Sequence, residues 1–398
     1  MPASQHHFEE FEPHTRLKHL VLQTYLQMWA RKLLLRPNAG AIVYYIDACA
    51  GRGMDDVGNR GSPVLAAREA GILEGQFRDR FSRNVRLQVV AIEKQASHFR
   101  ALRDNLEPFG DRARAVLGSL SEHFDALSSE MADAPALFFI DPFGIEPLRA
   151  DVIRAALARP YAEVLLLFAD QAALRHFGVA SAVENLPNES DYAGELFDLT
   201  EEERNQVADA RAAREEALGA TPERCIEIMD AAFGDHAWYD AVNAVPQDQR
   251  RATLRRLFQA FLARAGANRV LPIPIRDARN RHVYYLMHAT KSPNGYATMK
   301  DAVEGALKHA SLSGAATDTI RFQVRSDLNA VERQVRERFA GQTIRWAEDR
   351  TNPRGSCVSR YALEDTTAYP SQLKDLKERL AGLRQPGRSI VYRFPGAR

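Results

Sequence analysis

The chain has 398 residues, of which 45% are hydrophobic and 26% are charged, and its formal net charge at pH 7 is +1. This composition is typical of an ordinary soluble globular protein with one large domain or two smaller ones. The cysteines number three, at positions 49, 225 and 357, which excludes a disulfide framework and an all-cysteine zinc site.

The amino-terminal stretch MPASQHHFEEFEPHTRLKH is too polar for a signal peptide. No apolar run reaches the roughly 18 to 20 residues that a membrane span needs. We therefore expect a cytoplasmic protein, and the low cysteine content fits a reducing compartment.

In chain order, an apolar stripe predicts a helix over residues 15–35, which Pro37 and Gly40 end. Continuous apolar runs then predict buried strands over 41–49, 85–94, 113–119, 135–144 and 162–169. Helices are predicted between them over 61–73, 96–110, 122–132 and 149–160. Because helices alternate with strands that are apolar throughout, the fold class is α/β: a doubly wound, mainly parallel sheet covered on both faces.

Residues 171–250 break this alternation and predict a charged helical insertion beside the sheet. A helix over 253–270 follows, and residues 281–310 predict a strand, a turn at Pro293-Asn294-Gly295 and a helix. The domains are therefore an amino-terminal helix packed on the core (1–40), a Rossmann-like domain (41–310) and a carboxyl-terminal module (320–398).

The tail from 321 to 398 carries 16 Lys/Arg against 9 Asp/Glu, a local balance of +7. Predicted helices over 327–341 and 370–383, and a strand over 387–394, indicate a helix–helix–strand module of winged-helix type. Such a module suits nucleic acid. A packing module with a solvated basic face is an open alternative.

Acidic and small residues follow three of the predicted strands. In a doubly wound sheet, ligands bind beyond the carboxyl ends of the strands, near the switch point. The first strand ends in Asp47 and leads into the loop Ala48-Cys49-Ala50-Gly51-Arg52-Gly53. Small residues there let the backbone approach a ligand and point amides at it.

The second strand ends in Glu93, and a carboxylate in that place can accept both ribose hydroxyls of an adenosine group. The fourth ends in Asp141-Pro142-Phe143-Gly144. Each acid by itself also suits a structural cap, but their order and spacing predict a nucleoside-binding site.

The glycines at 51, 53, 58 and 61 do not form the GxGxxG of a dinucleotide site, and the GK[ST] of a P-loop is absent. The loop and Glu93 instead resemble class I S-adenosylmethionine (AdoMet) methyltransferases, in which the first acid lies near the methionine end. Amino-group methyltransferases of nucleic-acid bases carry [DN]PP[YFW] after the fourth strand. The acid there accepts hydrogens from the amine and the aromatic ring stacks on the base. Here the motif is one proline short, so Phe143 is either a stacking ring or a packed loop aromatic.

Seven stretches in order resemble the three-Cys-motif partner proteins (TcmP), a family similar to class I methyltransferases and often encoded beside a three-cysteine radical-AdoMet-type protein. They are PHTRLKHLVLQTYLQMW, YIDACAGRG, GSPVLA, AIEK, FIDPFG, AAFGDHAW and YYLMHATKSPNGYATMK. The resemblance covers roughly residues 13–310, and it implies an AdoMet-binding, methyltransferase-like protein with a partner.

The resemblance implies two sets of site residues. The cofactor-binding set is Asp47, Ala50, Gly51, Gly53, Ser62, Pro63, Glu93 and Ser119, the last in the place of the family's third-strand acid. The catalytic set is Asp141, Pro142, Phe143 and Gly144. The expected function is methyl transfer from AdoMet to an amine of a nucleic-acid base or nucleotide. A non-catalytic Rossmann-like partner or nucleic-acid-binding accessory protein is the alternative, so the sequence leaves enzymatic activity open.

Other polar residues favour structural roles. The histidines lack a third ligand at suitable spacing, so no metal site is expected. Cys49 is interpreted as a small loop residue rather than a nucleophile. Lys18 and His19 either line the site or cap an element.

Overall fold

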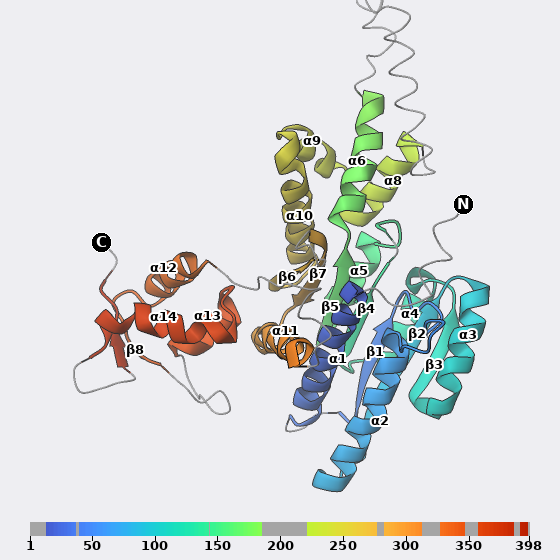
Figure 1. Cartoon of the computed structure of the whole chain (residues 1–398), viewed down its shortest axis with the longest axis horizontal. Coiled ribbons are helices and arrows are strands. Elements are labelled where there is room, and N and C mark those ends of the chain that lie inside the picture. Colours follow the sequence, from blue (N-terminus) through green and yellow to red (C-terminus); the bar gives the residue numbers. More distant parts are fainter. Residues whose placement is uncertain are drawn as a thin grey trace, which may run out of the picture.

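The computed structural model places a main domain and a smaller carboxyl-terminal module side by side (Figure 1). Phe143 and the predicted insertion between 185 and 220 lie outside the described residues. The described residues are 13–36, 40–142, 144–184, 221–276, 282–312, 327–346, 357–385 and 391–396.

A seven-stranded sheet forms the centre of the main domain, in the order β3-β2-β1-β4-β5-β7-β6. Its strands are β1 (Ile42–Asp47), β2 (Arg86–Glu93), β3 (Ala113–Leu117), β4 (Ala136–Ile140), β5 (Ala162–Phe168), β6 (Arg269–Arg276) and β7 (His282–Thr290). β1 to β5 run parallel to one another, whereas β7 is antiparallel to both β5 and β6. The prediction of a doubly wound, mainly parallel sheet is confirmed, and the arrangement is a Rossmann-like fold with the antiparallel strand β7 between β5 and β6.

Helices cover both faces of the sheet, because β1, β2, β4 and β5 are mainly apolar on both sides, whereas the edge strand β3 is partly exposed. One face packs against α1 (Pro13–Leu34), α2 (Ser62–Phe81), α3 (Ala96–Leu106) and α11 (Pro293–Leu312). The other packs against α4 (Leu120–Met131), α5 (Ala150–Ala158), α6 (Asp170–Glu184), α8 (Pro222–Phe233), α9 (Ala237–Asn243) and α10 (Gln247–Arg264). The 3₁₀ helix η2 (Glu107–Arg112) precedes β3. None of the helices in the described ranges combines the length and apolar character that a membrane crossing requires.

Strand β6 was not predicted from the sequence, because its segment RVLPIPIR contains Pro272 and Pro274, which lack a backbone N–H. It forms nonetheless, since β6 is an edge strand paired with β7 alone. Proline is tolerated in such a strand when its missing donor faces outward. Leu271, Ile273 and Ile275 alternate with the prolines and are buried against α1 and α11.

Helix α1 is tied to the sheet by a buried polar cluster. The Tyr25 hydroxyl donates to Glu163 of β5, and the Glu163 Oε2 atom lies 2.8 Å from Nε2 of His288 in β7. All three side chains are buried, so these hydrogen bonds satisfy groups that water does not reach. The cluster fixes the position of α1, whose first turns reach the opposite end of the strands.

The carboxyl-terminal module has its own small core, which includes Val331, Trp346, Leu376 and Tyr392. Its elements are α12 (Leu328–Arg338), β8 (Thr343–Arg345), α13 (Val358–Asp365), η3 (Pro370–Gln372), α14 (Leu373–Arg379), η4 (Ala381–Leu383) and β9 (Val391–Arg393). β8 and β9 form a two-stranded antiparallel sheet. The sequence predicted two helices and one strand here and missed β8 and α13, and the winged-helix assignment stays a prediction.

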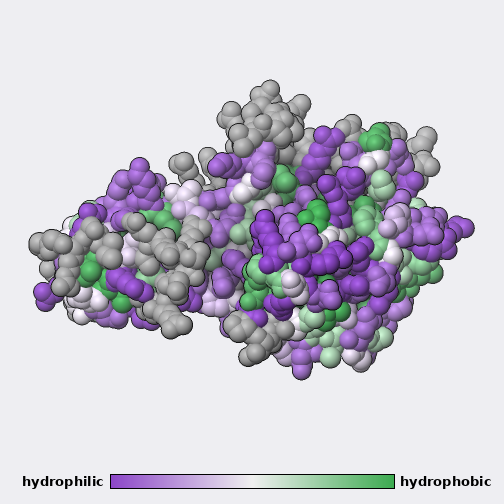
Figure 2. Space-filling model, turned by 90° about the horizontal axis from the view of Figure 1, so that it is seen from below, coloured by the Kyte–Doolittle hydropathy of each residue, from purple (hydrophilic) through white to green (hydrophobic). Residues whose placement is uncertain are grey.

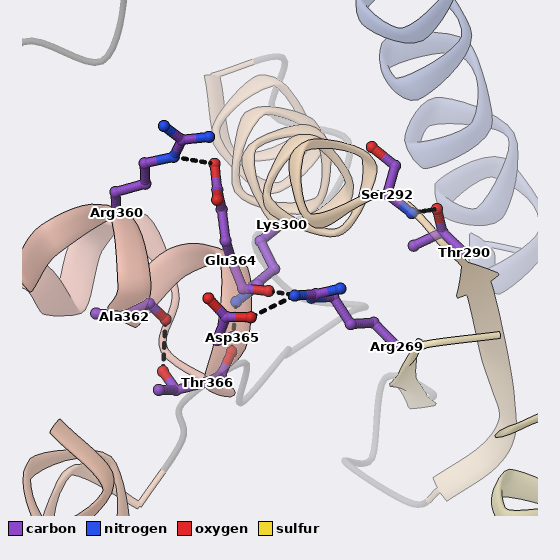
Figure 3. Close-up of polar contacts among 9 residues, drawn as sticks. All are labelled: Arg269, Thr290, Ser292, Lys300, Arg360, Ala362, Glu364, Asp365 and Thr366. Carbon is purple, nitrogen blue, oxygen red and sulfur yellow. Dashed lines mark hydrogen bonds and ion pairs between the residues drawn. The ribbon is translucent and has the colours of Figure 1, made fainter. Parts of the chain in front are cut away.

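The module docks on α11 and on the start of β6 (Figure 3). Arg269 contacts the Asp365 carboxylate and the Glu364 carbonyl, both at the end of α13. The buried Lys300 ammonium of α11 donates to the backbone carbonyl of Thr366 at 2.7 Å. It also donates to the backbone carbonyl of Ala368 at 2.9 Å. In the space-filling view the module is a lobe beside the main domain, and the visible surface of both is mainly hydrophilic (Figure 2).

Candidate functional site

The loop after β1 is held between β2 and β4. The Ala48 amide donates to the Phe139 carbonyl at 2.9 Å, and the Ala50 amide donates to the Ile92 carbonyl at 3.0 Å. The Gly51 amide donates to Glu93 Oε2 at 2.8 Å. The loop is therefore fixed at the switch point between β1 and β4, where doubly wound sheets bind ligands.

A side chain would crowd its neighbours at two glycines of this region. Gly53 has φ +78°, and a Cβ atom there would lie 3.1 Å from Leu102 Cδ1. Gly61 donates its amide to the Gly53 carbonyl at 2.8 Å, and a Cβ on Gly61 would lie 3.0 Å from that carbonyl oxygen. This contact joins the loop to the first turn of α2, where Ser62 and Pro63 stand.

Asp47 is fully buried and lies under the loop rather than on its surface. Its Oδ2 atom accepts from the Tyr45 hydroxyl at 3.0 Å, and its carboxylate also accepts from Ser62 and from the Cys49 amide. Burial raises the pKa of Asp47 to about 7, and the negative charge of Asp141 adds to the shift while the Ser62 and Tyr45 hydrogen bonds oppose it. Asp47 therefore acts on a ligand through its charge and fixes the loop through its hydrogen bonds to Ser62 and the Cys49 amide.

Glu93 holds the loop with one carboxylate oxygen and the start of α3 with the other. Oε2 accepts from the Gly51 amide at 2.8 Å, and Oε1 accepts from the Gln95 amide at 2.7 Å. Each carboxylate oxygen can accept more than one hydrogen bond. The carboxylate is therefore oriented by the backbone and keeps acceptor capacity for a ligand.

Asp141 forms an ion pair that was not predicted from the sequence. Its Oδ2 atom contacts the Lys18 ammonium of α1, and both side chains are largely buried, at 17% and 7% exposure. The Asp141 backbone amide also donates to the Cys49 sulfur. The sequence does contain a sign that Lys18 is buried. It stands three and four residues before the buried Val21 and Leu22, so all three lie on the same face of the helix.

Two described neighbours of this pair, His19 and Cys49, are uncharged at pH 7. Burial and the Lys18 charge lower the pKa of His19 to about 3, so that imidazole is neutral at pH 7. Burial raises the pKa of the Cys49 thiol, with Asp47, Asp141 and Glu93 adding to the shift, so the thiol keeps its proton. This agrees with the interpretation of Cys49 as a small loop residue.

A cavity of about 330 Å³ opens on the other side of the loop, on the face of α4, α5 and α8. Ala48, Cys49 and Ile140 line its floor, and Ser119 and Leu120 line one wall. Its volume lies at the lower end of the range for small-molecule sites. No described residue of the carboxyl-terminal module lines it.

Charged residues that the sequence did not single out surround this cavity. They include Lys94, Arg149 and Arg224. Arg224 of α8 donates to Glu146, in the loop after β4, at 2.6 Å. Helix α8 belongs to the predicted insertion, whose distance from the strand motifs in the sequence concealed its place at the site.

The remaining predicted residues lie at the same edge with different roles. Ser119 caps α4 in a capping box with Glu122, which occupies both its hydroxyl and its amide. Pro142 is buried, Gly144 has φ +91°, and Phe143 lies outside the described residues. No group of three or more His, Cys, Asp or Glu side chains within the described ranges is arranged to hold a metal ion.

No family model matches the sequence, and no curated protein matches it. Similar solved structures include cofactor-bound Rv0187 from MTB, at 15% identity over 68% of this chain and 79% of that chain, with a TM-score of 0.33. Another is the O-methyltransferase from Bacillus cereus in complex with SAH, at 15% identity over 73% of this chain and 84% of that chain, with a TM-score of 0.34. TM-scores this low carry no argument about activity. The resemblance to the TcmP family stays a prediction, and the fold assignment rests on the strand order.

Proposed function

We propose that the chain is an AdoMet-dependent methyltransferase. The observation that carries this proposal is the meeting of three features at one edge of the sheet: the glycine loop, the Glu93 carboxylate oriented by that loop, and the adjoining cavity. Glu93 would accept the ribose hydroxyls, and the cavity would take the adenine ring. Asp47, Ala50, Gly51, Gly53, Ser62 and Pro63 would shape the floor beneath the cofactor, and Ser119 would border the adenine.

The charge around the loop favours a cationic group of the ligand over a nucleotide phosphate. The cavity itself is lined by both signs, with Lys94, Arg149 and Arg224 beside Glu146 and Glu227. Three acids, Asp47, Glu93 and Asp141, surround the loop, and Lys18 is the cation paired with one of them. A polyphosphate would be repelled by these carboxylates, whereas a sulfonium and an ammonium would be attracted. The family resemblance implies the same cofactor.

We further propose that the acceptor is an amine of a nucleic-acid base or nucleotide. AdoMet would supply an electrophilic methyl group, and the amine would displace S-adenosylhomocysteine, which would leave with the electron pair of the carbon–sulfur bond. The methylated nitrogen would then release one proton to solvent. Lys18 occupies Oδ2 of Asp141, which leaves Oδ1 to accept a hydrogen from the amine, and we propose the Pro142 carbonyl as the second acceptor. Such a site works by positioning more than by acid–base chemistry.

Binding and transfer can be tested separately. Isothermal titration should detect AdoMet binding to the wild-type protein, and Glu93→Ala should weaken it at least tenfold, whereas the exposed-face control Glu130→Gln should not. Absence of binding at high micromolar AdoMet would refute the cofactor assignment. A tritiated-methyl assay on DNA, RNA and nucleotides should then show label that Asp141→Ala abolishes.

A second candidate is a Rossmann-like partner protein without methyl-transfer activity. The engagement of Asp141 by Lys18 favours it, because that carboxylate already has a strong partner. Stable co-purification with a neighbouring three-cysteine radical-AdoMet-type protein, together with AdoMet binding and no transfer to any acceptor, would support this candidate over the first.

We also propose that the carboxyl-terminal module contacts nucleic acid, since Lys374 and Arg384 are exposed on it and the tail is basic. Changing both to glutamine in the full chain should weaken binding to a labelled duplex and reduce its salt dependence. The double variant Arg78→Gln/Arg80→Gln, which removes the same two charges from the exposed part of α2, is the control. Equal binding by both variants would contradict this role.

A further inference from the structure

Lys18 has hydrogen-bonding capacity that the protein does not use. An ammonium has three N–H donors, and the structure records one acceptor for it among the described residues, Oδ2 of Asp141. The side chain is 7% exposed, so bulk water reaches it poorly. Buried donors are satisfied in nearly all native proteins. The two remaining donors therefore indicate an acceptor that a ligand supplies.

The location of Lys18 restricts where that acceptor belongs on the ligand. The cavity lies on the face of α4, α5 and α8, whereas Lys18 comes from α1 on the opposite face of the sheet. The loop from Ala48 to Gly53 lies between the two, with Cys49 contacting both the cavity and the Asp141 amide. A ligand whose adenosine fills the cavity would cross this loop and place its other end beside Lys18.

The surrounding charge restricts the chemistry of the acceptor. Asp141 contacts Lys18 directly, and Asp47 lies close enough for its pKa to respond to the charge of Asp141. A phosphate, with close to two negative charges, would meet both acids, whereas a carboxylate carries one charge and in an α-amino acid is accompanied by an ammonium. His19 is neutral and offers no second cation.

We propose that Lys18 recognises the carboxylate at the amino-acid end of the adenosyl ligand, with Asp141 holding the ammonium of Lys18 in place. The inference rests on the proposed AdoMet site. Lys18 is then a specificity-determining residue. It favours an adenosyl ligand with a zwitterionic amino-acid tail over one whose tail is neutral, purely cationic or phosphorylated.

The test compares two ligands that differ in one group, AdoMet and decarboxylated AdoMet, by isothermal titration. Lys18→Met should weaken AdoMet binding by about 10- to 100-fold, the range for one charged hydrogen bond, and change binding of the decarboxylated ligand less than threefold. Lys18→Arg should retain most of the AdoMet affinity. Lys32→Met is the matched control, because Lys32 is on the same helix and donates to Thr298 at the other end.

Removing Lys18 also leaves the Asp141 charge without its partner, which can destabilise the fold or attract cations. The double variant Lys18→Met/Asp141→Asn removes both charges and should show the same loss of discrimination between the two ligands. Equal weakening of both ligands, or unchanged discrimination in both variants, would overturn the role of Lys18. Failure of the wild-type protein to bind either ligand would instead refute the proposed function.

Discussion

At the scale of single residues, the most consequential group is the buried carboxyl of Asp47. In the unfolded chain it ionises near 3.8, and in the folded protein burial raises its pKa to about 7. Between these values the folded state binds more protons than the unfolded state, so this residue lowers the free energy of unfolding as pH rises, and the loss is complete above about pH 7.

Asp47→Asn should therefore stabilise the ligand-free protein at pH 8, by about 2–4 kcal/mol, and have little effect near pH 4. Urea unfolding followed across this pH range is the measurement, with the exposed Asp104→Asn as the control. A stability gain that does not depend on pH would contradict the assignment of the shifted pKa to Asp47. The same substitution should weaken AdoMet binding, because the ligand is a cation.

His19 acts in the opposite direction. Its pKa falls from 6.5 to about 3 on folding, so the unfolded state binds more protons between these values and the free energy of unfolding rises with pH. His19→Gln should remove this rise. Because the Asp47 and His19 slopes oppose each other, the wild-type protein should show a nearly level stability between about pH 4 and 6.5, whereas each single variant should show a slope of opposite sign.

Gly53 and Gly75 provide a matched pair for the loop. Gly53→Ala should cost at least 1 kcal/mol of stability, because φ is +78° and the new Cβ would press on Leu102. Gly75→Ala, inside α2 with open space around it, should stabilise the protein by about 0.5–1 kcal/mol. The measurement is the midpoint temperature of thermal unfolding of each variant relative to the wild type. Similar changes in this temperature for both variants would mean that the loop tolerates a side chain at Gly53.

At the scale of elements, the docking of α13 on α11 depends on a few buried polar contacts. Lys300→Met would leave the Thr366 and Ala368 carbonyls without their donor, so the module should detach more readily. Limited proteolysis should cut the variant faster between 366 and 372, and calorimetry should resolve two transitions. Lys308→Met, exposed on the same helix, is the control, and equal cleavage of both variants would contradict the role of Lys300.

Elements with continuous apolar runs could be predicted from the sequence, because burial on both faces of a parallel sheet imposes that composition. β6 could not, since its two prolines are permitted only by its place at the sheet edge. The turn expected at Pro293 is instead the start of α11. Proline suits both a turn and a first helical position, so the residue pattern alone did not distinguish a turn from a helix start at Pro293.

At the site, the strand-end acids Asp47, Glu93 and Asp141 could be predicted, because each stands at the carboxyl end of a buried strand and the parallel strands β2, β1 and β4 are neighbours in the sheet. The charged residues that complete the site come from elsewhere: Lys18, the partner of Asp141, from α1, and Arg224, which lines the cavity, from α8. Such long-range contacts depend on how helices pack across the sheet, which local spacing does not encode.

At the scale of the whole molecule, the module and the candidate site lie at opposite ends of the strands. Arg269 contacts the module and pairs with Thr290 of β7. Thr290 also pairs with Glu163, near the start of β5, so this contact lies at the amino ends of the parallel strands. Asp47 and Asp141 are at the carboxyl end. With strands of five to nine residues, the separation along the sheet is about 20–25 Å.

That separation implies a dependence on acceptor length. A mononucleotide at the edge beside Asp141 would leave the module empty, whereas a polynucleotide seated on the module would have to run along the outer margin of the sheet to present a base there. A duplex rises 3.4 Å per base pair, so contact with both places would require about seven base pairs or more. Oligonucleotides shorter than this should compete no better than single nucleotides.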